Sequence, residues 1–163
     1  MARADRKHLV IGYGNELRGD DGAGCRIGRT VEHWAHPGTQ VLVTHQLMPE
    51  LAAALAEVRI ATFIDVYPAD QPRAPVNLYR IVRPHGLTSE HPGPHACQPE
   101  DLLNLTEQVY GNRPVGWVLA VPAHDFSIGE QLTPSTTRAI QDALMLLRIH
   151  LDTMALAEDK ELM

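Results

Sequence analysis

Cysteine and long apolar runs are scarce in this sequence. Its two cysteines, Cys25 and Cys97, are too few for a disulfide framework and indicate free thiols in a reducing cytoplasm. No segment approaches the roughly 20 consecutive apolar residues that a membrane helix needs. The N-terminal residues lead into a short apolar stretch that is typical of a first strand rather than of a signal peptide. A membrane is therefore not an expected partner.

Positive charge is also scarce. Lys and Arg together number 14 against 20 Asp and Glu, the net charge is −6, and no basic cluster interrupts this acidic balance. Nucleic acid is therefore not an expected partner. The remaining composition, with 44% hydrophobic and 21% charged residues, is ordinary for a globular protein. Without a repeat or a linker, the chain is expected to form one domain over residues 1–163, with residues 157–163 as a frayed end.

Segments of strand length alternate with segments of helical periodicity. Strands are expected at residues 8–12, 40–44, 60–66, 76–82 and 116–121, and helices at residues 21–34, 99–110 and 134–151, with one more helix opening at Pro49. This alternation predicts an α/β fold. We expect one domain of three layers, in which a mainly parallel, twisted sheet of about five strands is flanked by helices on both faces. The histidines in or near helical patterns are expected at the surface: His33, His36 and His150.

The first expected strand runs into a glycine-rich loop. Gly12 and Gly14 resemble the start of a dinucleotide-binding turn, but Leu17 stands where that fingerprint has its third glycine. We expect both glycines to serve close backbone packing or a positive φ. The loop also carries three carboxylates: Glu16, Asp20 and Asp21. Carboxylates repel phosphate and attract cations, although the two aspartates are equally typical N-caps of a following helix.

Polar residues follow the first three expected strands. Glu16 lies beyond the first strand, His45 follows the second, and Asp65 lies at the end of the third. Ligands of open α/β sheets bind beyond the carboxyl ends of the parallel strands. A functional site is therefore expected at that edge of the sheet.

The glycine-rich loop resembles the opening motif of the [NiFe]-hydrogenase maturation proteases. The motif reads Gly12-x-Gly14-Asn15-x-Leu17-x-x-Asp20-Asp21-Gly22-x-Gly24. The likeness extends over residues 8–150, and residues 45–51 are similar to one subgroup of the family. Members of this family are endopeptidases that remove the C-terminal extension of the large-subunit precursor of a [NiFe]-hydrogenase. The resemblance therefore implies this activity and this precursor as the partner.

The resemblance also implies a divalent-metal site made of one glutamate, one aspartate and one histidine. On the matching positions these are Glu16, Asp65 and His95, which precedes the helix at residues 99–110. Residues 84–99 form a long irregular stretch rich in Pro, Gly and His, which is typical of a functional segment. His91 leaves the register of the histidine open, because members often carry small hydroxyl residues just before the metal ligand and this chain does not.

The implied residues act as both metal ligands and catalytic groups. One imidazole and two carboxylates suit Ni²⁺ or Zn²⁺ and leave coordination positions open. The expected metal is nickel supplied by the substrate, with zinc or cadmium as a surrogate. A metal can polarise the scissile carbonyl or lower the pKa of bound water, and a metal-activated water is the simplest hypothesis for attack on the peptide bond.

Other interpretations remain at this stage. A non-enzymatic nickel-binding chaperone would use the same three residues to hold the precursor without cutting it. A nucleotide-binding domain is disfavoured by Leu17 and the acidic loop. Neither a G-x-S-x-G elbow nor an H-E-x-x-H motif occurs. Cys25 fits a core position, and Cys97 is either a reactive thiol or a small buried side chain.

Overall fold

Strands and helices alternate along the chain as the sequence predicts. The computed structural model describes residues 7–82 and 97–161. Its elements in chain order are β1 (His8–Tyr13), the 3-10 turn η1 (Gly19–Gly22), α1 (Ala23–His33), β2 (Thr39–Thr44), α2 (Leu51–Leu55), β3 (Ile60–Pro68), β4 (Asn77–Arg80), α3 (Pro99–Tyr110), β5 (Val115–Ala123) and α4 (Pro134–Glu161). No helix within these residues is long and apolar enough to span a membrane.

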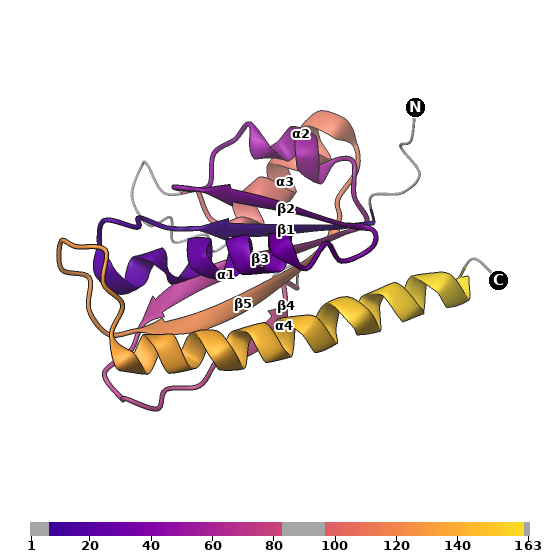
Figure 1. Ribbon diagram of the computed structural model, residues 1–163. Helices are drawn as coiled ribbons and strands as arrows, with labels where there is room; N and C mark the ends of the chain where they lie inside the picture. The colour runs from indigo at the N-terminus through magenta and orange to yellow at the C-terminus, as the bar shows by residue number, and fades with distance from the viewer. Residues whose placement is uncertain (1–6, 83–96, 162–163) are drawn as a thin grey trace.

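The five strands form one sheet in the order β2-β1-β3-β5-β4. The pairs β1–β2, β1–β3 and β3–β5 are parallel, and β4 runs antiparallel to β5 at one edge. Helices cover both faces of the sheet (Figure 1). The predicted α/β fold with a mainly parallel five-stranded sheet is therefore confirmed.

Apolar side chains that alternate along each strand form two cores, one on each face of the sheet. Leu9 and Ile11 of β1 pack with α2 and α3, in a cluster that includes Phe63 and Leu102. Val10, between them, packs on the opposite face with α1 and α4. Side chains of a strand point alternately to its two faces, so one residue of shift would exchange the two cores. The main-chain register of β1 is therefore fixed from both sides.

The two glycines of the loop after β1 serve close packing, as predicted. A Cβ on Gly12 would collide with the carbonyl oxygen of Gly24, and one on Gly14 would collide with that of Asp21. Gly14 also has φ +144°, a conformation that favours glycine. Both glycines allow the start of α1 to lie directly against the end of β1.

Most strand bounds differ from the prediction by one to a few residues, and two helices differ in ways that their contacts explain. The turn η1 precedes α1, so the helix expected from residue 21 begins at Ala23. The last helix runs past Leu151 to Glu161, through residues expected in part as a frayed end. Near the end of this helix, the carboxylates of Glu158 and Asp159 lie 3.9 Å and 3.4 Å from Nζ of Lys7, the residue before β1. Contacts far apart in sequence therefore extend the helix.

One predicted surface histidine is buried. His150 of α4 is 5% exposed, and its Nε2 lies 3.0 Å from the hydroxyl oxygen of Thr62. The same hydroxyl oxygen lies 2.7 Å from Nε2 of His8. The prediction for His150 was wrong because a polar partner on β3 satisfies the ring inside the core.

Candidate functional site

The carboxyl ends of the parallel strands lie at one edge of the sheet, where the acidic loop connects β1 to α1. Gly24 of α1 packs so closely on this edge that a Cβ there would lie 3.1 Å from the carbonyl oxygen of Ile64, beside a collision with that of Tyr13. The helix start, the end of β1 and the end of β3 are thus held together. Side chains of the acidic loop are consequently carried to within reach of Asp65.

Asp65 lies beside Tyr13 at this edge. The register pairs Leu9 with Ala61 and Ile11 with Phe63, so the next position of the same face sets Tyr13 against Asp65. The Val66 amide donates a hydrogen bond to Asp65 Oδ1 at 2.9 Å, and the Tyr13 side chain is near enough to influence the pKa of this carboxyl.

The pKa of Asp65 is shifted by its surroundings, and Asp65 in turn shifts the pKa of two tyrosines. Burial raises the pKa of the Asp65 carboxyl, and the charge of Asp21 acts in the same direction, while the Tyr13 hydroxyl and the Val66 amide act against them. Burial and the nearby Asp65 carboxylate also raise the pKa of Tyr13 well above its ordinary value. The pKa of Tyr79 of β4 is also raised, first by burial and then by the charge of Asp65. We call Tyr13, Asp21, Asp65 and Tyr79 the edge cluster.

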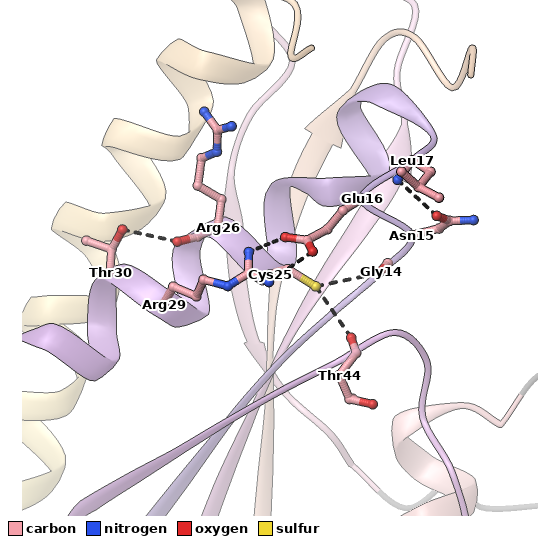
Figure 2. A network of polar contacts seen from close by, with 9 residues as sticks. All are labelled: Gly14, Asn15, Glu16, Leu17, Cys25, Arg26, Arg29, Thr30 and Thr44. Carbon is pink, nitrogen blue, oxygen red and sulfur yellow. Dashed lines mark hydrogen bonds and ion pairs between the residues drawn. The ribbon is translucent and has the colours of Figure 1, made fainter. Parts of the chain in front are cut away.

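Glu16 has a different set of partners. Arg29 of α1 binds its carboxylate with both terminal nitrogens, with Nη2 donating to Oε2 at 2.9 Å (Figure 2). The two side chains are 44% and 52% exposed. The hydrogen bond from Arg29 holds the pKa of Glu16 below its ordinary value. In the structure Glu16 therefore engages α1, and the loop carboxylate that acts on Asp65 is that of Asp21.

Asp21 was not singled out by its position in the sequence, where an aspartate before a helix indicates an N-cap. Neither η1 nor α1 has a side-chain cap hydrogen bond, so the capping interpretation was wrong for both aspartates. The Asp21 carboxylate instead accepts the amide of Asn15 at 2.7 Å. This bond closes the acidic loop and turns the Asp21 side chain toward the sheet edge.

Asp20 is fully buried and joins the acidic loop to the loop between β5 and α4. Its carboxylate accepts the amides of His124, Asp125 and Thr133 at 2.8, 3.0 and 2.7 Å, and the Thr133 hydroxyl at 2.8 Å. Burial acts to raise the pKa of Asp20, but these hydrogen bonds outweigh it and lower the pKa. The partners lie more than a hundred positions away, so no local pattern could reveal this role.

The two cysteines carry no nucleophilic thiolate. Cys25 is buried as expected, and its thiol donates to the carbonyls of Gly14 and Thr44 at 3.5 and 3.4 Å (Figure 2). Burial raises its pKa to about 11, with Glu16 adding to the effect. Burial and Asp101 likewise raise the pKa of Cys97. Both are thiols near neutral pH, which favours the unreactive alternative for Cys97.

His95 and His91 both lie outside the described residues, and His45 is exposed just after β2. Within residues 7–82 and 97–161, no group of three or more His, Cys, Asp or Glu side chains is arranged to hold a metal ion. Asp65 and Asp21 carry carboxylate oxygens, which suit a divalent cation, and the charge of Asp21 acts on Asp65.

Comparison with known proteins identifies the fold. The chain matches no family model and no curated protein. Among solved structures, the hydrogenase maturating endopeptidase HybD from E. coli has 21% identity and a TM-score of 0.70, with 91% of this chain and 93% of that chain covered. The maturation protease HycI from Thermococcus kodakarensis KOD1 has 13% identity and a TM-score of 0.67, with 91% and 92% covered.

A hydrogenase 2 maturation peptidase from a Thaumarchaeota archaeon is similar to the same extent, with 18% identity, a TM-score of 0.66, and 90% of this chain and 98% of that chain covered. The likeness thus spans nearly the whole of each chain. The protein has the fold of the hydrogenase maturation proteases.

Proposed function

We propose that this protein is an endopeptidase that removes the C-terminal extension of a [NiFe]-hydrogenase large-subunit precursor after nickel insertion. The observation that carries the proposal is the edge cluster, in which the half-buried Asp65 carboxylate feels the charge of Asp21 at the ligand-binding edge of the sheet. The fold shared with hydrogenase maturation endopeptidases along nearly the whole chain supports the same activity.

In this proposal the nickel belongs to the substrate. Asp65, His95 and one carboxylate of the acidic loop bind the nickel that the precursor carries, and the peptide bond to be cut is thereby brought to the edge of the sheet. Nickel can polarise the scissile carbonyl or activate a water molecule. The protein's own contribution is to hold the two carboxylates on rigid elements, the end of β3 and a loop closed by Asn15.

Two residues compete for the role of the loop carboxylate. Glu16 matches the family motif that the sequence resembles, and in the structure its carboxylate is already bound by Arg29. Asp21 already acts on Asp65 through its charge. This charge interaction supports Asp21, the family motif supports Glu16, and mutation of each residue separates the two.

The test incubates the purified protein with nickel-loaded precursor and measures the mass of the large subunit. We expect wild type to shorten it, and Asp65→Asn and His95→Ala to slow cleavage more than about 10-fold. Asp21→Asn is expected to have the same effect and Glu16→Gln a smaller one. Glu57→Gln, an exposed carboxylate before β3 at the opposite edge, is the matched control. A precursor that is bound but never shortened would identify a chaperone instead.

A further inference from the structure

Two large apolar side chains lie in solvent beside the candidate site. Leu17 of the acidic loop is 60% exposed, and Ile128 of the loop between β5 and α4 is 93% exposed. Both loops leave the carboxyl edge of the sheet, where the parallel strands β1 and β5 end (Figure 1). Single exposed apolar residues are common on protein surfaces, but these two lie on loops that are hydrogen-bonded to each other.

The two loops are paired through their main chains. The Gly129 amide donates to the carbonyl oxygen of Leu17, and the Gly19 amide donates to the carbonyl oxygen of Gly129, both at 2.8 Å. The residue next to Ile128 is therefore bonded directly to Leu17. The two apolar residues consequently lie on adjoining segments, although they are more than a hundred positions apart in the sequence.

The chain just before Ile128 is fixed as well. The Ser127 amide donates to Oδ1 of Asp125 at 2.8 Å, and the carbonyl oxygen of Asp125 accepts the amide of Asp20 at 2.8 Å. Hydrogen bonds on both sides of Ile128 therefore hold its loop against the acidic loop. An apolar surface that is fixed in advance loses little conformational entropy when a partner covers it.

Hydrogen bonds also connect Leu17 to the edge cluster. The Leu17 amide donates to Oδ1 of Asn15 at 3.0 Å (Figure 2), and the Asn15 amide donates to Oδ2 of Asp21, a member of that cluster, at 2.7 Å. An endopeptidase has to bind the residues on either side of the bond that it cuts. A precursor whose scissile bond lies at the edge cluster therefore passes over the surface next to it.

We propose that Leu17 and Ile128 form an apolar contact surface that binds an apolar side chain of the precursor close to the peptide bond that is cut. The inference rests on the endopeptidase activity proposed above and adds a requirement on the substrate, which is an apolar residue near the cleavage point. Neither residue carries a group that takes part in the reaction. The contact is made before the transition state as well as in it, so it acts on KM and not on kcat.

The experiment measures the rate at which nickel-loaded precursor is cut as its concentration is raised. We expect Ile128→Ser to raise KM about 10-fold and to leave kcat within about 2-fold of wild type, because it removes binding alone. Leu17→Ser is expected to act in the same direction. Ile149→Ser and Leu156→Ser are the matched controls, since both residues are exposed on α4 several turns beyond its start, and we expect them to behave as wild type.

The outcomes separate this inference from the proposed function. If wild type cuts the precursor and Ile128→Ser has the same KM, the contact surface is wrong and the endopeptidase stands. If wild type neither binds nor cuts the precursor, the proposed function fails and the inference fails with it. Sedimentation of the free protein tests a second copy of the chain as the occupant. A dimer that Ile128→Ser dissociates, with KM unchanged, would overturn the inference. Should Leu17→Ser fail to fold, Ile128→Ser decides the test alone, because its side chain is almost wholly in solvent.

Discussion

A single buried carboxylate, that of Asp20, links the acidic loop to the start of α4. Three amides and one hydroxyl donate to it, and the Thr133 hydroxyl also accepts the amide of Thr136 at 3.2 Å in the first turn of α4. Loss of this acceptor leaves several buried donors unsatisfied. The residue therefore controls the local structure of two loops at once.

We predict that Asp20→Asn lowers the free energy of unfolding by about 2–4 kcal/mol, because hydrogen bonds to a charged group are lost and an amide donor faces other donors. Urea denaturation measures this change. Asp142→Asn, an exposed position on α4, is the matched control and should change stability by less than about 0.5 kcal/mol. Equal stability of the two variants would show that Asp20 is dispensable.

At the scale of elements, the glycine-rich loop depends on close approach as well as on backbone conformation. Gly14 and Gly129 share φ +144°, but a Cβ would collide with Asp21 only at Gly14 and would meet nothing within 4 Å at Gly129. The two positions therefore separate strain of the backbone from collision.

We predict that Gly14→Ala destabilises the protein by at least about 1 kcal/mol more than Gly129→Ala, because it adds a collision to the shared backbone strain. Thermal unfolding of both variants gives the difference. Gly14→Ala should also weaken Zn²⁺ binding, since the displaced carbonyl belongs to Asp21. A similar loss of stability in the two variants would mean that only the dihedral angle matters.

Elements with local signals were predictable from the sequence, and α3 illustrates this. Gln98 and Asp101 form a capping box around Pro99, and Gly111 ends the helix with φ 72°, so both predicted ends agree with the structure. The position of Asp65 followed similarly from the apolar run of β3. The partner of Glu16 did not, because an exposed arginine on α1 can bind many carboxylates and no pattern specifies which one.

At the scale of the whole molecule, two buried histidines connect stability to pH. Burial, with the charges of His150 and His36, lowers the pKa of His8 from 6.5 to about 3. Burial lowers the pKa of His150 to about 4. Both rings are therefore neutral in the folded protein, whereas the unfolded chain takes up protons on them below about pH 6.5.

We predict that stability is fully present above pH 6.5 and declines as pH falls toward 4, with about 2 kcal/mol lost per histidine at pH 5. Urea denaturation between pH 5 and pH 7.5 measures the slope. His150→Gln should flatten it, and His33→Gln, an exposed position on α1, should not. A slope that His150→Gln leaves unchanged would assign the effect to other groups.

The proposed activity also concerns the whole molecule, because it couples a metal to an irreversible cut. We predict that nickel-free precursor is cleaved at least about 10-fold more slowly than nickel-loaded precursor, since it lacks the ion that completes the site. The rates are compared by mass spectrometry of the large subunit. Equal rates would show that nickel does not gate the reaction.

The arrangement of His8, Thr62 and His150 restricts the positions of hydrogen atoms within the core. Among the hydrogen bonds of the described residues the Thr62 hydroxyl has no partner besides these two rings, so we expect it to donate its one proton to one ring and to accept from the other. Two neutral rings bound in this way must adopt different tautomers, one protonated on Nε2 and the other on Nδ1. Both hydrogen bonds of the trio therefore donate in the same direction, from one ring through the hydroxyl to the other ring. Nitrogen-15 chemical shifts should accordingly show two different imidazole tautomers.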